Sequence, residues 1–159
     1  MSTIDTLPVD RDDSRRGGHL IERRFVPTEI ELFMYCAATW NTHRIHYDRD
    51  YARLEGYRDL VVPGPMQAAR LGQMVAEFAA ANDGRLAAMS VRHHAPLYCN
   101  DAATMHADVA SLGGTAEVPR VELAIAVVDV TGVAATSGTA TLVLSGSAKL
   151  LRLVDGGLA

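Results

Sequence analysis

Hydrophobic residues recur along this chain with two periods, of three to four residues in the first half and of two residues in the second. The longer period first occurs in four apolar residues, Ile30, Phe33, Met34 and Ala37. Thr28 and Glu31 have the spacing of a capping box, in which each side chain binds the backbone N–H of the other residue. The pattern predicts an amphipathic helix over residues 28–39.

Two further helices are expected before the pattern changes. Asp48 can cap a short helix that Gly56 ends. Pro65 suits the first turn of a longer helix extending to about Ala81, because an N–H in that turn has no helical partner to lose. The apolar residues of this helix cover nearly its whole circumference: Met66, Ala68, Ala69, Leu71, Met74, Val75, Phe78 and Ala79. Such a helix is expected to be buried.

After Asn82-Asp83-Gly84, alternating apolar and polar residues predict strands. The expected strands are residues 89–97, 105–109, 121–131 and 133–145, together with an early strand at 20–26. This order predicts an α+β fold, in which an antiparallel sheet wraps around the long helix. We expect one domain over residues 19–152, a flexible arm over 1–18 and a tail over 153–159.

Composition narrows the classes of function. At a net charge of −4, the chain lacks the concentrated basic face that nucleic-acid binding needs. It has no run of about 18 apolar residues that predicts a membrane span, and residues 1–18 lack the apolar segment of a signal peptide. Cys36 and Cys99 are too few for a disulfide framework. We expect two reduced, partly buried thiols in a cytoplasmic protein.

The densest group of polar side chains lies between the first two expected helices. Residues 39–48 read Thr-Trp-Asn-Thr-His-Arg-Ile-His-Tyr-Asp, with an amide, two histidines, an arginine and a carboxylate. Buried polar groups destabilise a core unless each has a partner. Histidine, with an ordinary pKa of about 6.5, transfers protons at neutral pH. The segment is therefore the first candidate for a reaction site.

Residues 39–48 resemble the signature of MaoC-like hydratases and dehydratases, and are most similar to the branch of type 2 hydroxyacyl-thioester dehydratases and fungal-synthase-like dehydratases. The resemblance continues through Asp50-Tyr51-Ala52, Glu55-Gly56-Tyr57 and Leu60-Val61-Val62-Pro63-Gly64-Pro65. It implies a hotdog fold, in which a curved antiparallel sheet wraps a central helix. It also implies reversible hydration of a 2-enoyl thioester, carried by coenzyme A or an acyl-carrier protein, without a redox cofactor or metal.

The resemblance also assigns roles within residues 39–48. It makes His46 the acid/base residue. The broader family has aspartate where this chain has Asn41, which can hold the water or orient the thioester but cannot accept a proton as aspartate does. We therefore consider His43 and Asp48 as alternative partners in proton transfer. Arg44 either neutralises a substrate carboxylate or a coenzyme A phosphate, or pins the loop to backbone carbonyls.

The start of the long helix supplies the other half of the expected site. A helix start presents unpaired N–H groups and the positive end of the helix dipole. We expect the Gly64 and Met66 N–H groups to bind the thioester oxygen, as the resemblance also implies. Pro63, where the branch often has histidine, and Trp40 are expected to line the substrate site.

Other interpretations remain. In isolation, His43 and His46 are typical loop histidines bonded to backbone carbonyls, and with Asp48 they form a weak candidate metal set. His93 is in phase with apolar neighbours and is expected to be a hydrogen-bonded core histidine. Two alternative functions are the non-catalytic acyl-binding half of a heteromeric dehydratase, and a thioesterase with Glu77 as its carboxylate. Unpaired sheet edges predict a homodimer.

Overall fold

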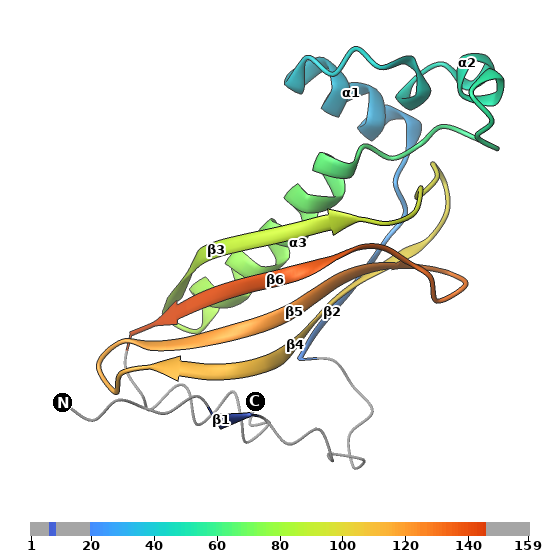
Figure 1. Ribbon diagram of the computed structural model, residues 1–159. Helices are drawn as coiled ribbons and strands as arrows, with labels where there is room; N and C mark the ends of the chain where they lie inside the picture. Colours follow the sequence, from blue (N-terminus) through green and yellow to red (C-terminus); the bar gives the residue numbers. More distant parts are fainter. Residues whose placement is uncertain (1–6, 9–19, 146–159) are drawn as a thin grey trace.

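A single antiparallel sheet organises the protein. The computed structural model describes residues 7–8 and 20–145, and shows this sheet with a long helix on one face and a smaller helical unit at one end (Figure 1). The strands are β1 (Leu7–Pro8), β2 (Ile21–Phe25), β3 (Gly84–His93), β4 (Ala103–Gly114), β5 (Pro119–Asp129) and β6 (Ala134–Leu144). Their order is β1-β4-β5-β6-β3, and β2 also pairs with β4. The predicted α+β class is confirmed.

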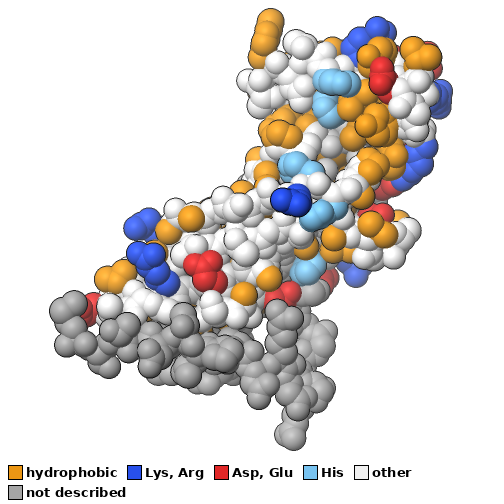
Figure 2. Space-filling model, in the orientation of Figure 1, with side chains coloured by type: hydrophobic (Ala, Val, Ile, Leu, Met, Phe, Trp, Pro, Cys, Tyr) orange, Lys and Arg blue, Asp and Glu red, His pale blue; other side chains and the backbone are white. Residues whose placement is uncertain are grey.

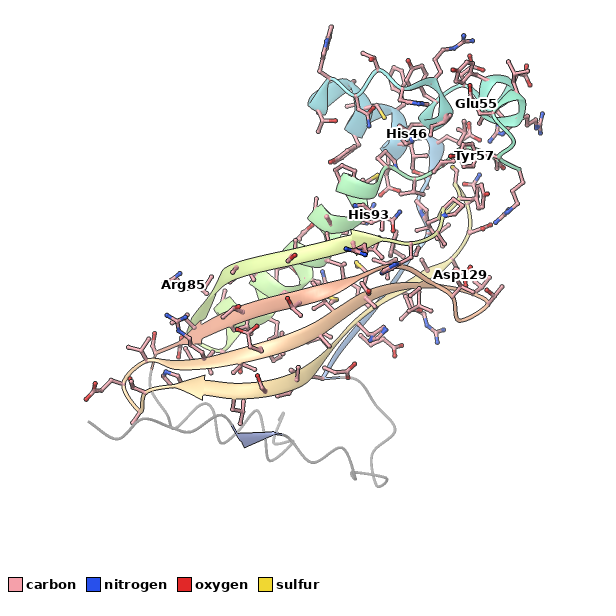
Figure 3. The ribbon with its side chains drawn as sticks, in the orientation of Figure 1. His46, Glu55, Tyr57, Arg85, His93 and Asp129 are labelled. Atoms are coloured by element: carbon pink, nitrogen blue, oxygen red, sulfur yellow. The ribbon has the colours of Figure 1, made fainter. Side chains whose placement is uncertain are left out.

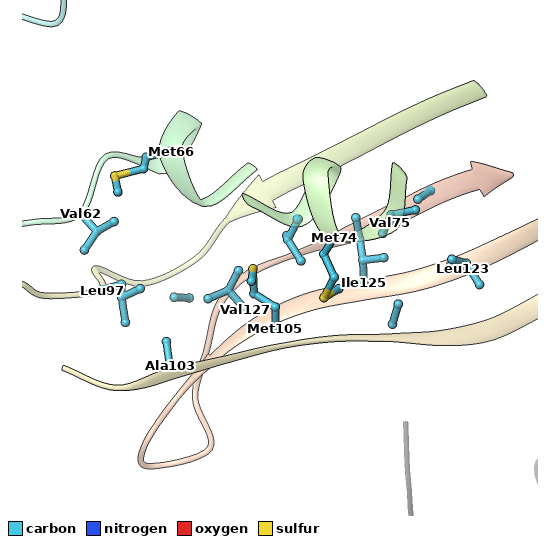
Figure 4. Close-up of a cluster of buried hydrophobic side chains, with 14 of the residues drawn as sticks. Val62, Met66, Met74, Val75, Leu97, Ala103, Met105, Leu123, Ile125 and Val127 are labelled. Atoms are coloured by element: carbon cyan, nitrogen blue, oxygen red, sulfur yellow. The ribbon is translucent and has the colours of Figure 1, made fainter. Parts of the chain in front are cut away.

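The hydrophobic core lies between the sheet and the long helix α3 (Gly64–Ala81), which packs on β3, β5 and β6. Alternate residues of β5 point toward the helix and are buried: Val121, Leu123, Ile125 and Val127. The helix contributes Leu71, Met74, Val75 and Ala79, all of them fully buried. Figure 4 shows Met74 and Val75 facing Ile125 across this core. Burial of this apolar surface is the main force that holds α3 on the sheet.

The expectation that α3 is buried on nearly all sides is wrong. The sheet covers one face of the helix, and the opposite face is exposed at Ala69, Gln73, Glu77 and Ala80. The alanines made the helix look apolar all round in the sequence. Their side chains carry so little apolar area that exposing them costs little free energy.

Residues 84–99 differ from the single predicted strand at 89–97. β3 begins at Gly84, directly after α3, and ends at His93. Leu97 belongs to a separate segment, where its carbonyl accepts the Val62 N–H at 2.8 Å and the Cys99 N–H donates to Leu60 at 2.9 Å. The alternating pattern therefore covers two separate segments that pair with different parts of the protein, so the prediction of one strand over residues 89–97 is wrong.

The strands at 20–26, 105–109, 121–131 and 133–145 all occur, with ends shifted by a few residues. Within the predicted arm, Leu7 and Pro8 form β1, which pairs with β4. The rest of the arm and the predicted tail at 153–159 lie outside the described residues, as does the predicted domain boundary at 152.

The smaller helical unit, which we call the overhang, consists of α1 (Glu29–Thr39), the 3-10 helix η1 (Arg44–His46) and α2 (Arg49–Leu54). The predicted capping box is present, with Thr28 N–H donating to Glu31 at 2.8 Å and Glu31 N–H donating to the Thr28 hydroxyl at 3.3 Å. Arg70 of α3 binds Glu31 at 2.5 Å and so ties the overhang to the long helix. The sequence did not predict η1.

Gly138 of β6 offers a stability test of the sheet. A Cβ at this position would lie 1.9 Å from the Ser90 carbonyl oxygen, so a side chain forces β3 away from β6. We expect Gly138→Ala to lower the free energy of unfolding by about 2–4 kcal/mol. The control is Gly72→Ala in α3, where the nearest atom to a new Cβ is the flexible end of Met89 at 3.4 Å. The free energy of unfolding of that variant should rise by up to about 1 kcal/mol, because alanine has a higher helix propensity than glycine. Denaturant unfolding of both variants measures the difference, and equal stability would contradict the β3–β6 register.

Candidate active site

The overhang is joined to α3 by residues 57–63, which we call the strap. Leu60, Val61 and Val62 of the strap are buried. The strap lies between η1 and the segment after β3, because Val61 N–H donates to the Ile45 carbonyl at 3.0 Å and residue 61 bridges Tyr98 from the other side. Its backbone therefore fixes the distance between the polar segment 39–48 and the start of α3.

His46 is held by the strap. It is 9% exposed, and its Nδ1 lies 2.7 Å from the Val61 carbonyl oxygen. A carbonyl only accepts, so Nδ1 carries the proton and Nε2 of the neutral ring keeps its lone pair. Burial lowers the pKa of His46, against the opposing effect of the Val61 hydrogen bond, and nearby His43 lowers it further. The ring is therefore kept neutral and oriented, as a proton acceptor must be.

Asn41 lies in the turn that follows α1. Trp40 adopts a left-handed conformation (φ 54°) and ends the helix, with its side chain 85% exposed. The Asn41 side-chain oxygen then accepts the His43 N–H at 3.3 Å. His43 caps η1 through a long contact of 3.5 Å from the Ile45 N–H to its Nδ1. In the described structure both side chains shape the loop that carries His46.

Asp48 and Arg44 form a pair. One Asp48 oxygen accepts the Tyr51 N–H at 3.0 Å and caps α2 as predicted, and the other accepts Arg44 at 2.5 Å. The Tyr51 hydrogen bond and then the Arg44 guanidinium lower the pKa of Asp48. Arg44 also lies over the Tyr51 ring at 4.4 Å. These bonds argue against Asp48 as a proton acceptor, and favour the loop-pinning interpretation of Arg44 with the Asp48 carboxylate as its partner.

The start of α3 only partly matches the expected oxyanion site. The Met66 N–H donates to the Pro63 carbonyl at 3.0 Å, so the expectation that it is available is wrong. Met66 itself is buried beside Val62, as Figure 4 shows. The Gly64 N–H has no hydrogen-bond partner among the described residues. The first turn of α3 contains no acidic residue, so the positive end of the helix dipole is not neutralised there.

His93 is not the core histidine that its phase predicted. It faces α3, but it is exposed, because β3 ends there beside the first turn of the helix. Its Nδ1 lies 2.8 Å from the buried Thr136 hydroxyl, which in turn donates to Gln67 of α3 at 2.8 Å. The sequence analysis did not predict this series of hydrogen-bonded side chains. The one available signal was Gln67, a polar residue on the otherwise apolar face of α3.

Two cavities flank the strap and the overhang. The larger, about 340 Å³, is lined by residues of the strap, the start of α3 and the end of β3, including Tyr57, Val61, Gly64, Gln67 and His93. The smaller, about 180 Å³, lies under α1 and is lined by Trp40 and Asn41 among others.

Only three of the predicted site residues line these cavities, Gly64 the larger one and Trp40 and Asn41 the smaller one. His46 is bonded to the strap. Figure 3 shows His46 in the overhang and His93 at the end of β3, with Tyr57 of the strap labelled near them. In Figure 2, histidine side chains gather on the face that includes the overhang and its junction with the sheet.

Other candidates find structural roles in the described part of the chain. Glu77, the thioesterase candidate, is exposed and binds Arg23 at 2.9 Å, and its Gln73 and Arg23 partners lower its pKa. His43, His46 and Asp48 do not form a metal-binding group, and the described residues contain no other. Cys36 and Cys99 are unpaired and buried, and burial raises the pKa of both thiols. None of the described helices is both long and apolar enough to span a membrane.

The family model of hydroxyacyl-thioester dehydratase type 2 matches residues 8–99, more than half of the chain and the whole of the overhang, strap and α3. The chain belongs to this family. A curated relative, mesaconyl-C(4)-CoA hydratase of Chloroflexus aurantiacus, is 44% identical over 80 residues. The match covers 49% of this chain and only 27% of that relative.

Solved structures agree on the fold of this type 2 dehydratase family member. The R-hydratase PhaJ1 of Pseudomonas aeruginosa superimposes with a TM-score of 0.71 at 17% identity, over 80% of each chain. A structure of the ChsH1–ChsH2 complex from Mycobacterium tuberculosis gives a TM-score of 0.68 at 19% identity, over 80% of this chain and 96% of that one. The predicted hotdog fold is confirmed.

The geometry of His46 predicts both its tautomer and a pH dependence of stability. Because burial lowers the pKa of the folded ring, the unfolded chain, in which histidine titrates near about 6.5, binds the proton more readily. Stability is therefore full above about pH 6.5 and falls as the pH drops below it. Denaturant unfolding should show this slope, and His46→Gln should reduce it. Nitrogen-resolved NMR should find His46 protonated at Nδ1, and an Nε2–H tautomer would contradict the Val61 bond.

Proposed function

We propose that this chain catalyses the reversible addition of water to a 2-enoyl thioester, with His46 as its acid/base residue. One observation carries the proposal: the Val61 carbonyl binds His46 Nδ1 at 2.7 Å, and the same strap leads three residues later to Gly64. A proton acceptor and a free N–H donor are thereby linked by one short, buried segment. This is the pairing that the reaction needs, a base for water and a donor for the thioester oxygen.

In the hydration direction, His46 Nε2 accepts a proton from water as the water oxygen bonds to Cβ. The electron pair of the C=C bond then moves toward the thioester carbonyl, and the oxygen gains negative charge. The Gly64 N–H, at the positive end of α3, stabilises that charge. Protonation of Cα completes the product, and the dehydration reverses each step. Asn41 orients the loop or the water, since an amide cannot accept the proton.

A coenzyme A thioester is the first substrate to test. The Chloroflexus relative is named for a dicarboxylic enoyl-CoA, mesaconyl-C(4)-CoA, which supports a panel of short monocarboxylic and dicarboxylic enoyl-CoAs. An acyl-carrier protein is the alternative donor. The two buried unpaired thiols support a reducing compartment such as the cytoplasm.

His46→Gln tests the proposed acid/base residue. Glutamine keeps a donor for the Val61 carbonyl but cannot transfer protons at neutral pH. We expect kcat/KM for hydration of crotonyl-CoA to fall by about 100-fold or more, with a free energy of unfolding within about 1 kcal/mol of the parent. The control is His106→Gln in β4, whose neighbours Met105 and Ala107 are buried in the core while its own side chain is on the other face. Parent-like turnover by His46→Gln would remove His46 from the mechanism.

A non-catalytic half of a heteromeric dehydratase is the second candidate function. Asn41 favours it, because the residue lacks the proton-accepting carboxylate of the broader family, and the ChsH1–ChsH2 structure is a complex of two different chains. The purified chain distinguishes the two functions. Turnover of any enoyl-CoA in the panel by the chain alone supports the enzyme. Binding of the thioesters without turnover, restored by a partner chain, supports the acyl-binding half.

We also propose a homodimer that forms through β3. Among the described strands, β3 pairs only with β6, so its other edge offers free backbone groups to a second copy. Sedimentation equilibrium should give twice the 17.1 kDa mass of the chain. In hydrogen exchange, the amides of β3 should then be protected on both edges. A monomer at micromolar concentration, with rapid exchange along β3, would contradict the proposal.

A further inference from the structure

A short chain of buried polar groups leads from the core to His93. Gln67 is 2% exposed and Thr136 is fully buried, although both lie in the apolar contact between α3 and the sheet. The Gln67 amide nitrogen donates to the Val62 carbonyl at 3.4 Å, which orients the amide so that its oxygen faces Thr136. Burial of such groups is costly unless each is bonded. In this series of hydrogen bonds every side chain has a partner, and the last partner is the ring of His93.

The direction of these bonds fixes the state of the ring. The Thr136 hydroxyl donates its single proton to Gln67 at 2.8 Å, so its oxygen can only accept from His93 Nδ1, also at 2.8 Å. Nδ1 is therefore protonated, and Nε2 of the neutral ring is an acceptor. His46 is held in the same tautomer by the Val61 carbonyl. The protein thus fixes two histidines through Nδ1 and leaves the Nε2 of each for chemistry.

The free nitrogen of His93 lies at the start of α3. A Cβ placed on Gly64 would come within 2.7 Å of both Nε2 and Cδ2 of His93, so this end of the ring rests against the Gly64 backbone. Gly64 and His93 line the same cavity of about 340 Å³. In a thioester whose oxygen is bound at the Gly64 N–H, the carbon next to the carbonyl is Cα. His93 Nε2 is thus a base beside Gly64, in the cavity that would hold this part of the thioester.

We propose that His93 is a second catalytic residue, which exchanges the proton of Cα while His46 serves the oxygen on Cβ. These separate roles of His93 and His46 rest on the proposed function. In dehydration, neutral His93 Nε2 takes the Cα proton, and the C–H electron pair moves to the thioester oxygen, which Gly64 stabilises. The pair returns to form the C=C bond as the Cβ–O bond breaks. The hydroxyl leaves as water with a proton that His46 Nε2 has first taken from solvent, and His93 returns the Cα proton to solvent, so both rings end neutral.

His93 supplies the proton-accepting group that residues 39–48 lack. Asn41 cannot take a proton, and each Asp48 oxygen already accepts a hydrogen bond, one from Tyr51 and the other from Arg44. His43 contacts the Ile45 N–H through the nitrogen that would accept a proton. His93 has a fixed free nitrogen, a cavity and two buried residues that support it.

The first test compares His93→Gln with His46→Gln in the dehydration of 3-hydroxybutyryl-CoA. We expect each variant to lose about 100-fold or more in kcat. Deuterium at Cα should then slow His93→Gln more than His46→Gln, because transfer of the Cα proton limits only the former. A kcat for His93→Gln within about threefold of the parent, or a larger isotope effect in His46→Gln, overturns the proposal.

The second test separates positioning by Thr136 from simple stability. Thr136→Val keeps the shape and removes the hydroxyl, whereas Thr136→Ser keeps the hydroxyl. We expect Thr136→Val to lower kcat about tenfold, Thr136→Ser to retain activity, and Thr136→Val to add less than about twofold in the His93→Gln background. NMR of the ring nitrogens should show the His93 Nδ1–H tautomer in the parent and its loss in Thr136→Val. Equal effects of Thr136→Val with and without His93 overturn the supporting role.

The outcomes also separate this inference from the function on which it rests. If the parent turns over thioesters, depends on His46 and tolerates His93→Gln, the inference fails and the proposed function stands. If the parent turns over no thioester in the panel, the proposed function fails, and the role of His93 fails with it. His106→Gln again controls for loss of a histidine that does not line the cavity, and thermal unfolding by circular dichroism shows that each variant is folded.

Discussion

The backbone of Val61 is the constraint on which the rest of the site depends. Its N–H donates to the Ile45 carbonyl at 3.0 Å and its carbonyl accepts His46 Nδ1 at 2.7 Å, so one residue fixes η1 and orients the histidine within it. The same backbone then enters Pro63 and Gly64 with no flexible linker between. Pairing of the strap with Leu97 and Cys99 anchors this geometry to the core. The proposed reacting groups are thus positioned by backbone hydrogen bonds rather than by long side chains, which would cost more conformational entropy to order.

Charge supports the same arrangement from outside. Arg49 binds Glu29 at 2.5 Å and Asp59 at 2.7 Å, so it joins α1, α2 and the strap, and both carboxylates raise its pKa. Arg70 joins α3 to α1. Pairs of this kind at half-exposed positions each contribute little to stability. Their effect here is on geometry, because they hold the overhang above the start of α3. The apolar side chains of the overhang are then available to line the cavities.

Local signals in the sequence predicted the elements well. The capping box at Thr28 and Glu31, the cap at Asp48 and the period-two strands all depend on neighbouring residues, and the structure contains them. The failures involve distant contacts. His93 has the phase of a core residue, but only the end of β3 beside α3 decides that it is exposed. Its partner Thr136 is 43 residues away, a pairing that no local pattern encodes. The prediction that the Met66 N–H is available was wrong for another reason, because this N–H closes the first turn of the helix.

We propose that a thioester binds with its oxygen at Gly64 and its reacting carbons toward His46. A crystal structure of the His46→Gln variant with bound crotonyl-CoA tests this placement. We expect the thioester oxygen within about 3.2 Å of the Gly64 N–H, in the larger cavity, with Cβ directed to residue 46. A thioester bound instead in the smaller cavity lined by Trp40, or with its oxygen away from the start of α3, would rule out this placement.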